Sequence, residues 1–270
     1  MSSVAQEGHL LGASDGLSFE IINPEGSSPI LLVCEHAANR VPARLGKLGL
    51  EPAELASHVG WDPGALALAR GLSSAFDAQL IAARFSRLVY DCNRPPDAPS
   101  AMPGDTEVCV VPGNIDLTPG DREARVAEIY LPFHAALADL IARKRSAGGT
   151  PIVVTVHSFT PIFRGERRDV EIGFLCDRDD RLARALRDFC AGHSTYDIRL
   201  NQPYGPADGV LHTIEKHLGE GPFPYAMIEV RNDLLAAENG LAEVATLLGN
   251  ALAEAVSGSN FNETTRWPEA

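Results

Sequence analysis

Short apolar runs recur along the chain, and between them apolar side chains return every three or four positions. The short runs are typical of strands buried in a sheet, and the periodic segments are typical of amphipathic helices. This pattern predicts strands over 19–23, 30–35, 79–83, 88–91, 151–156, 171–176, 196–200 and 225–230. It predicts helices over 62–76, 122–146, 181–191, 212–218 and 240–255.

Strands and helices alternate along the sequence, which favours an α/β fold with a mixed, mostly parallel sheet. Helices should cover both faces of that sheet and give a three-layer α/β/α sandwich. The sequence shows no internal repeat and no linker, so we expect one domain over 1–270, with a core of about 18–256 and frayed termini. Residues 93–118 are rich in proline and glycine and lack periodicity, which is typical of a lid or a binding loop.

The composition is that of an ordinary globular protein, with 45% hydrophobic and 22% charged residues. The formal net charge of −13 disfavours nucleic acids and anionic membranes as partners, although local arginines could still bind a small anion. No apolar run is long enough to span a bilayer, and the N-terminus lacks the pattern of a signal peptide, so we expect a cytoplasmic protein. The 5 cysteines and their spacing predict free thiols in a reducing compartment.

Two histidines stand at corresponding places, where predicted strands end. His36 follows the apolar run 30–35, and His157 follows 151–156. Reaction centres of open α/β sheets lie just past the carboxyl ends of the strands, so both side chains could reach one crevice. Neutral imidazoles suit zinc, which at catalytic sites takes three protein ligands and a water. We therefore expect one divalent metal ion, zinc, although a hydrogen-bonded histidine at a strand end would explain each residue alone.

The third metal ligand is less obvious. Asp62 is the preferred carboxylate, and its alternative role is to cap a helix with Pro63 at the first helical position. Glu35 is adjacent to His36, but neighbouring side chains of a strand point to opposite faces. Asn39 carries an amide, which is a poor zinc ligand. Asp62 is therefore the ligand that we expect, with Glu35 and Asn39 as the alternatives.

Glu229 lies within the last predicted strand, between two apolar residues. A carboxylate buried there must be paired or must have a raised pKa. Its functional interpretation is a general base for a metal-activated water. Its structural alternative is an ion pair with Arg231 at the strand end.

An arginine follows another predicted strand, in Asp91-Cys92-Asn93-Arg94-Pro95. Its guanidinium group could bind a substrate carboxylate through two parallel hydrogen bonds. Arg94 is the first candidate, and the further candidates are Arg40, Arg87 and Arg164. Each of these side chains could instead be a solvated surface charge.

The segment 212–218 contains a histidine and, three residues later, a glutamate: His212 and Glu215. Because such positions share a face of a helix, a second metal site is conceivable there. The more ordinary interpretation is a helix on the substrate side, with His212 facing the site.

Six blocks stand out in order along residues 20–255: Cys34-Glu35-His36-Ala37 with Pro42, Gly60-Trp61-Asp62-Pro63-Gly64-Ala65, Val89-Tyr90-Asp91-Cys92-Asn93-Arg94-Pro95, Val156-His157-Ser158-Phe159, Tyr204-Gly205-Pro206 and Ile228-Glu229-Val230-Arg231-Asn232-Asp233-Leu234. Together they resemble the N-formylglutamate amidohydrolase family, also called N-formylglutamate deformylases. That family is in turn similar to zinc carboxypeptidases, which implies a three-layer sandwich of the phosphorylase/hydrolase-like kind.

The resemblance implies that His36 and His157 bind the metal and that Glu229 activates water. It places Asn93 and Arg94 on a substrate carboxylate. The full set of substrate contacts that we expect is Asn93, Arg94, Arg40, Arg87, Arg164, Tyr204, His212 and Arg231. The chain also departs from the pattern. Asn39 stands where carboxypeptidases have a glutamate ligand, and Glu35-His36-Ala37-Ala38 replaces the Pro-His-Ser-Gly of many deformylases.

By this resemblance the chain is a metal-dependent amidohydrolase that converts N-formyl-L-glutamate and water to formate and L-glutamate, as in histidine degradation. One alternative is a zinc amidase or peptidase for a different N-acyl amino acid. Another is a non-catalytic α/β protein that binds a carboxylate ligand. The oligomeric state, monomer or homodimer, stays open at this point.

Overall fold

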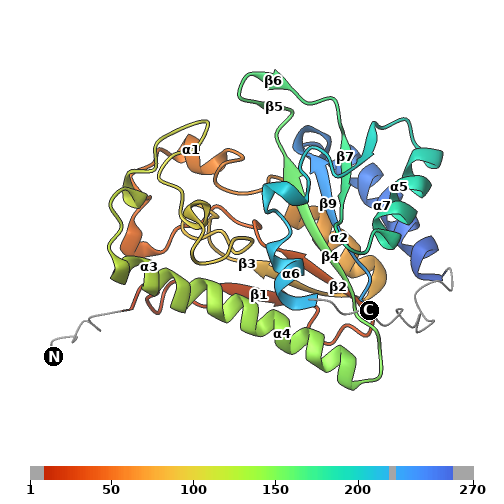
Figure 1. The fold of residues 1–270 in the computed structure, drawn as a ribbon, viewed down its shortest axis with the longest axis horizontal. Coiled ribbons are helices and arrows are strands. Elements are labelled where there is room, and N and C mark those ends of the chain that lie inside the picture. Colours follow the sequence, from red (N-terminus) through yellow and green to blue (C-terminus); the bar gives the residue numbers. More distant parts are fainter. Residues whose placement is uncertain (1–8, 219–222, 258–270) are drawn as a thin grey trace.

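The computed structural model describes residues 9–218 and 223–257, which form a seven-stranded sheet with helices on both faces (Figure 1). The strand order is β1-β3-β2-β4-β9-β7-β8. Its strands are β1 (Phe19–Ile22), β2 (Ile30–Cys34), β3 (Gln79–Ala83), β4 (Ile152–Phe159), β7 (Ile172–Leu175), β8 (Ile198–Leu200) and β9 (Tyr225–Arg231).

The four central strands β3, β2, β4 and β9 run parallel. At one edge β1 is antiparallel to β3, and at the other β7 is antiparallel to β9 and parallel to β8. The sheet is therefore mixed and mostly parallel, as predicted. The carboxyl ends of the four parallel strands meet along one edge, where α/β sheets carry their reaction centres.

Helices α2 (Ala65–Phe76), α5 (Arg181–His193) and α7 (Glu238–Ser257) pack against one another and against one face of the sheet. The opposite face carries α4 (Leu131–Ser146), with α6 (His212–Leu218) beside it (Figure 1). This confirms the predicted α/β sandwich. The shorter elements are α1 (Pro52–Ala56), α3 (Pro119–Arg125), a π-helical stretch over Val126–Tyr130, and 3-10 turns at Ala43–Leu45, Pro99–Ala101, Pro112–Asn114, Pro206–Asp208 and Asn232–Leu235.

The central strands are buried on both faces, because helices cover the sheet from each side. Every residue of β2 is fully buried, which explains its uninterrupted apolar sequence. All five cysteines are free, and four of them are buried, in agreement with the expectation from their spacing.

The strand predicted over 88–91 is wrong, because this stretch forms turns. Ser86 explains the difference. Its hydroxyl accepts a hydrogen bond from the Leu88 amide at 3.1 Å, and its carbonyl accepts one from the Val89 amide at 2.9 Å. Such local bonds occupy backbone groups that a strand would need.

Residues 160–169, predicted as a polar loop, contain a small hairpin of β5 (Ile162–Phe163) and β6 (Glu166–Arg167). Leu10, which precedes residue 18, is buried in the core, and the amides of Leu10 and Leu11 donate to the Glu128 carboxylate. The core therefore begins earlier than predicted. The expected frayed ends at 1–8 and 258–270 lie outside the described residues.

Candidate active site

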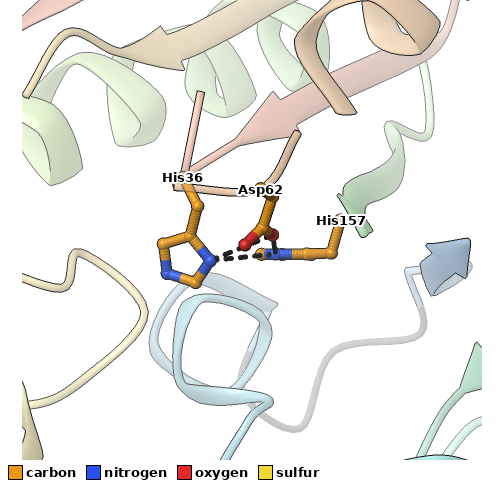
Figure 2. Close-up of side chains that lie close together, drawn as sticks. All are labelled: His36, Asp62 and His157. Carbon is orange, nitrogen blue, oxygen red and sulfur yellow. Dashed lines mark hydrogen bonds and ion pairs between the residues drawn. The ribbon is translucent and has the colours of Figure 1, made fainter. Parts of the chain in front are cut away.

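Three buried side chains from separate elements meet at the carboxyl edge of the sheet (Figure 2). His36 follows β2, His157 lies in the neighbouring strand β4, and Asp62 precedes α2. Their ligand atoms all lie within 4.8 Å of one another. The parallel pairing of β2 with β4 brings the two histidines together although 121 residues separate them.

The inward-facing atoms of this cluster form a tight triangle. The Nδ1 atom of His36 lies 3.2 Å from Asp62 Oδ2, and the Nδ1 atom of His157 lies 2.9 Å from the same oxygen. The two Nδ1 atoms are 3.2 Å apart. Two imidazole nitrogens and one carboxylate oxygen thus face a common point.

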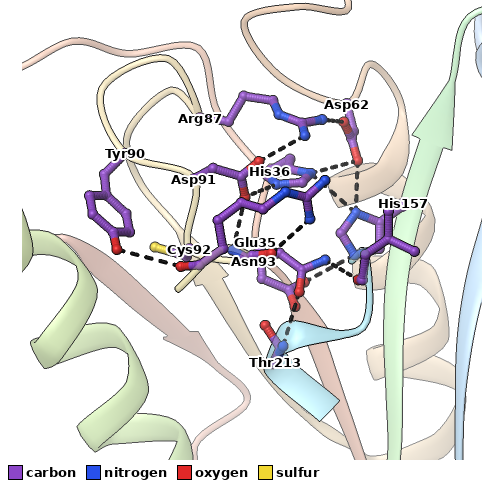
Figure 3. Close-up of polar contacts among 12 residues, drawn as sticks. Glu35, His36, Asp62, Arg87, Tyr90, Asp91, Cys92, Asn93, His157 and Thr213 are labelled. Carbon is purple, nitrogen blue, oxygen red and sulfur yellow. Dashed lines mark hydrogen bonds and ion pairs between the residues drawn. The ribbon is translucent and has the colours of Figure 1, made fainter. Parts of the chain in front are cut away.

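The outer nitrogen of each imidazole faces a second buried carboxylate (Figure 3). His36 Nε2 lies 2.7 Å from Asp91 Oδ1, and His157 Nε2 lies 3.2 Å from Glu35 Oε2. An imidazole whose Nε2 donates its proton to a carboxylate presents the lone pair of Nδ1 on the opposite side. This carboxylate–histidine arrangement orients the ligands of metal sites.

The donor set fits a small divalent cation. Tetrahedral zinc binds nitrogen and oxygen at about 2.0–2.1 Å, which separates neighbouring ligand atoms by about 3.3 Å. The three separations in the cluster are 2.9, 3.2 and 3.2 Å. His36, Asp62 and His157 could therefore hold one metal ion.

Electrostatics also draws positive charge to the cluster. Burial disfavours ionisation of Asp62, but the neighbouring His36 and His157 lower the pKa of its carboxyl group. Burial likewise opposes protonation of His157, but Glu35 and Asp62 raise the pKa of this imidazole well above its ordinary value. The protein therefore gathers carboxylates around two imidazoles, which favours a bound cation or, without one, a bound proton.

The alternative role of Asp62 as a helix cap is wrong. Helix α2 begins at Ala65, its N-cap residue is Gly64, and no side chain caps it. The Asp62 carboxylate instead faces the histidines and accepts a hydrogen bond from the Ser158 amide at 3.3 Å. Gly64 is required at the turn, because its φ of +84° is left-handed and an added Cβ would lie 2.4 Å from the Leu235 Cβ.

Glu229 lies beside the cluster, because β9 pairs it in register with His157 of β4. The side chain is 5% exposed, and its Oε2 atom has no hydrogen-bond partner among the described residues. Burial raises the pKa of Glu229 to about 7, the Asp62 carboxylate adds to this, and both histidines oppose it. A carboxyl group with this pKa can accept and return a proton near neutral pH.

Cys34 precedes this site at the end of β2. Its thiol is fully buried, and burial raises its pKa well above the ordinary value, with further contributions from Asp62 and Glu35. A protonated, enclosed thiol of this kind contributes packing.

The cluster opens into a cavity of about 470 Å³. Its lining includes the predicted substrate-side residues Asn93, Arg94, Arg87, Arg164 and Tyr204, together with Glu229. A second cavity of about 450 Å³ adjoins it and shares Asp62, Arg87, Arg94, Ser158, Phe163, Arg164 and Tyr204 as lining residues.

Residues 93–118 contribute to the wall of the second cavity. Glu107 of this segment lies 2.7 Å from His58 Nε2, and both side chains line the cavity. The segment is also anchored in the core through Asn114, whose amide donates to the Leu88 carbonyl and whose oxygen accepts from Arg125. It is thus a wall of the site that is held to the core.

Arg87 is held between two acidic side chains (Figure 3). It donates to Asp91 at 2.8 Å and to Asp62 at 3.4 Å, and these carboxylates raise its pKa although burial opposes this. Arg87 therefore compensates the charge of the cluster from the cavity wall. Arg94 differs, because it donates to two backbone carbonyls, those of Asn93 and Gly209.

Asn93 lies at the cavity wall, but both ends of its amide are occupied. Its nitrogen donates to the Val210 carbonyl, and its oxygen accepts from the Thr213 amide at 3.0 Å. The residue ties the start of α6 to the loop that carries Arg94 and Asp91. The side-chain amide of Asn93 therefore holds these two segments together.

Three predicted substrate contacts lie elsewhere and do not line either cavity. Arg40 donates to the Asp15 carbonyl and stacks 4.5 Å from the centroid of the Phe85 ring. Arg231 is bound by Asp233 and Glu171, so its strand-end ion pairs are formed with these residues.

His212 is the third residue placed away from the cavity. Its Nε2 atom lies 2.9 Å from the Tyr130 hydroxyl, and the ring packs against His134. The helical pair His212 and Glu215 forms no metal cluster, because His36, Asp62 and His157 are the one group of potential ligands found among the described residues. A substrate or metal role for His212 is therefore not supported.

Sequence reasoning missed Asp91 and Arg168 as parts of the site. Asp91 stands in a block singled out in the sequence, and its position two residues before Asn93 was the available signal. Glu35, an alternative metal ligand in the sequence, lies behind the ligands and faces the outer nitrogen of His157. Arg168 lies in a polar loop without periodicity, and no sequence pattern places it at the cavity that it lines.

The fold and the cluster define the class of protein: an α/β enzyme whose reaction centre lies at the carboxyl ends of parallel strands. A family model described as N-formylglutamate amidohydrolase matches residues 28–236. The chain therefore belongs to the N-formylglutamate amidohydrolase family, which makes it a hydrolase that acts on amide C–N bonds.

Similar proteins support this assignment. An N-formylglutamate deformylase from Pseudomonas aeruginosa is 26% identical over 260 residues, which cover 84% of this chain and 94% of that protein. One from Pseudomonas putida is 25% identical over 226 residues, which cover 74% of this chain and 83% of that protein.

Two solved structures share the fold. Gene product Atu2144 from Agrobacterium tumefaciens is 46% identical with a TM-score of 0.89, covering 92% of this chain and 98% of that chain. The N-formylglutamate amidohydrolase from Ralstonia eutropha JMP134 is 22% identical with a TM-score of 0.66, covering 89% of this chain and 97% of that chain. None of the helices within 9–218 and 223–257 has the length and apolar character needed to cross a membrane.

Proposed function

We propose that this protein hydrolyses an N-formyl amino acid, N-formyl-L-glutamate, to formate and the free amino acid. We propose further that one divalent ion, zinc, is held by His36, Asp62 and His157. The observation that carries the metal proposal is the convergence of two Nδ1 atoms and one carboxylate oxygen, with each outer nitrogen facing a buried carboxylate. The names of the two Pseudomonas relatives support the substrate.

The metal supplies Lewis acidity, which polarises a carbonyl and makes water a better nucleophile at neutral pH. Glu229 supplies the proton chemistry. Its unpartnered Oε2 takes a proton from the attacking water, and the same group returns it to the departing amide nitrogen. Hydrolysis then breaks the C–N bond, adds hydroxyl to the formyl carbon and leaves a free amino group.

Arg94 is the proposed ligand of the substrate α-carboxylate. Its Nη1 atom is fixed on the carbonyls of Asn93 and Gly209, and the side chain lines both cavities. A guanidinium group held in this way keeps its remaining donors available for a carboxylate. Binding at Arg94 would orient the scissile amide toward Glu229 and the cluster.

The test is formate release from N-formyl-L-glutamate by purified protein, with N-acetyl-L-glutamate in parallel and metal content measured on the same sample. We expect about one zinc per chain, release of formate, loss of activity after chelation and recovery when zinc is restored. Preference for the acetyl compound would show that the enzyme acts on a different N-acyl amino acid. Absence of hydrolysis of either compound by metal-loaded protein would contradict the proposal.

A further inference from the structure

Arg168 is a cation in the wall of the site cavity that has no role in the chemistry above. It follows the β5–β6 hairpin and is half-buried. Its guanidinium group lies 4.4 Å from the centroid of the Phe163 ring, 4.8 Å from that of Tyr204 and 5.6 Å from that of Phe159. Three aromatic rings therefore surround one cation next to the reaction centre.

The aromatic surroundings hold Arg168 without neutralising it. No carboxylate lies within ion-pair distance of Arg168 or Arg94 in the part of the chain that the structure describes, whereas Arg87 is paired with Asp62 and Asp91. Its Nη1 atom lies a long 3.5 Å from the Thr160 carbonyl, and the Tyr204 hydroxyl is a further polar partner of the guanidinium group. A guanidinium group stacked on rings loses little freedom on binding, and those of its five N–H donors that have no partner remain available for a carboxylate.

Arg168 and Arg94 reach the cavity from different parts of the fold. Arg94 lies in the loop that carries Asp91, the partner of His36. Arg168 lies beyond β4, with Tyr204 from the segment after β8 against its guanidinium group. Arg164 of the hairpin also lines the cavity without a carboxylate at ion-pair distance, but it is exposed and contacts the Phe163 ring alone, whereas Arg168 is half-buried among three rings. Arg94 and Arg168 are thus the two enclosed guanidinium groups without acidic partners, and a substrate with two carboxylates would satisfy both.

We propose that Arg168 binds the side-chain carboxylate of the substrate and thereby selects N-formyl derivatives of dicarboxylic amino acids, while Arg94 binds the α-carboxylate. This inference rests on the proposed hydrolysis and deepens it. The α-carboxylate lies close to the scissile nitrogen in every amino acid, so it suits the arginine that is tied to the loop of Asp91 and Asn93. The side-chain carboxylate lies farther out and suits the arginine beyond the hairpin.

The experiment compares three substrates that differ only in charge: N-formyl-L-glutamate, N-formyl-L-glutamine, which lacks the side-chain charge, and N-formyl-L-isoglutamine, which lacks the α-charge. Each is assayed as kcat/KM with wild type, Arg168→Gln and Arg94→Gln. The control is Arg167→Gln, because Arg167 is an exposed neighbour that lies near Asp169 and does not line either cavity. Thermal unfolding checks that each variant is folded.

We expect wild type to prefer formylglutamate over formylglutamine by about 10- to 100-fold, the range of a hydrogen bond to a charged group. Arg168→Gln should lose this preference, because its kcat/KM should fall on N-formyl-L-glutamate and on N-formyl-L-isoglutamine but not on N-formyl-L-glutamine. Arg94→Gln should lower kcat/KM on N-formyl-L-glutamine and leave kcat/KM on N-formyl-L-isoglutamine unchanged. Arg167→Gln should behave like wild type.

An equal loss on all three substrates in Arg168→Gln, or an unchanged preference, would overturn the proposal. Arg168→Lys keeps the charge but not the pair of parallel N–H donors, so its preference for N-formyl-L-glutamate over N-formyl-L-glutamine should be intermediate. If Arg168→Gln does not fold, an unchanged preference in Arg168→Lys overturns the proposal instead. Failure of the proposed function is a separate result, because wild type would then hydrolyse none of the three compounds.

Discussion

The Nδ1 atoms of His36 and His157 lie 3.2 Å apart and face each other. Two imidazole lone pairs at this separation repel unless a proton or a cation lies between them. The Asp62 oxygen closes the third side of the same space, at 2.9 Å from His157 and 3.2 Å from His36. This arrangement of atoms favours positive charge at the centre of the cluster.

Replacement of Asp62 by asparagine should weaken metal binding by at least about 100-fold, because a neutral amide is a poor ligand for zinc. The measurement is competition with a chromophoric chelator at fixed pH. Asp208→Asn is the control, since Asp208 lines the same cavity but is not part of the cluster. Equal metal affinity in the two variants would remove Asp62 from the ligand set.

Glu35 should strengthen metal binding without touching the metal. Its carboxylate is fully buried and faces His157 Nε2 at 3.2 Å, on the side of the imidazole away from the cluster. Partners of this kind typically contribute 10- to 100-fold in metal affinity. Glu35→Leu should therefore lower zinc affinity by about that factor, and Glu35→Gln, whose amide oxygen can still accept a hydrogen bond from His157, by less. Unchanged affinity in Glu35→Leu would show that Glu35 only fills space.

Glu229→Gln should separate catalysis from metal binding. The substitution keeps the shape of the side chain but removes its ability to accept a proton. General acid–base catalysis contributes about 10²- to 10⁴-fold, so kcat should fall by that factor. Zinc content and substrate KM should change little, because Glu229 lies beside the cluster and outside its triangle of ligand atoms. Retention of wild-type kcat would exclude Glu229 as the base.

The sequence predicted the parts of this molecule that follow from local pattern. Buried strands have continuous apolar runs, and residues at the ends of parallel strands must meet at one edge of the sheet. That rule is enough to bring His36, His157 and Glu229 together from the order of the strands alone. The three residues do lie within one site, as the strand positions implied.

The arginines could not be assigned in this way. A long charged side chain can reach partners from many parts of the chain, so its contacts depend on tertiary structure. Arg40 stacks on Phe85, and Arg231 pairs with Glu171, although both stand close to site residues in the sequence. Arg168 reaches the cavity from a loop without any periodic signal.

A histidine pair between α4 and α6 should make stability depend on pH. His134 Nδ1 lies 2.8 Å from His217 Nε2, and burial lowers the pKa of His134 to about 3 and that of His217 to about 4. An unfolded histidine has a pKa of about 6.5, so unfolding takes up protons below that pH. The pair's contribution to stability is therefore present above about pH 6.5 and is lost as the pH falls toward 4.

Urea unfolding of wild type and His134→Gln at pH 7.5 and pH 5 measures this effect. The free energy of unfolding should fall more steeply with decreasing pH in wild type, by up to about 1.4 kcal/mol per pH unit for each histidine. The comparison is needed because His36 and His157 have raised pKa values and act in the opposite direction. Parallel pH dependences in the two proteins would contradict the assignment.

Gly64 and Gly71 should respond oppositely to alanine, although both stand at or within α2. At Gly64 the backbone is left-handed and an added Cβ would meet the Leu235 Cβ at 2.4 Å, so Gly64→Ala should cost about 2–4 kcal/mol. At Gly71 the nearest atom would be the Ala245 Cβ at 3.9 Å, and alanine in an open helical position should stabilise by about 0.5–1 kcal/mol. Urea unfolding measures both changes.

Because Gly64 follows Asp62 by two residues, Gly64→Ala should also weaken zinc binding, and Gly71→Ala should not. Equal stability of the two variants would show that the turn before α2 adapts to a side chain at Gly64.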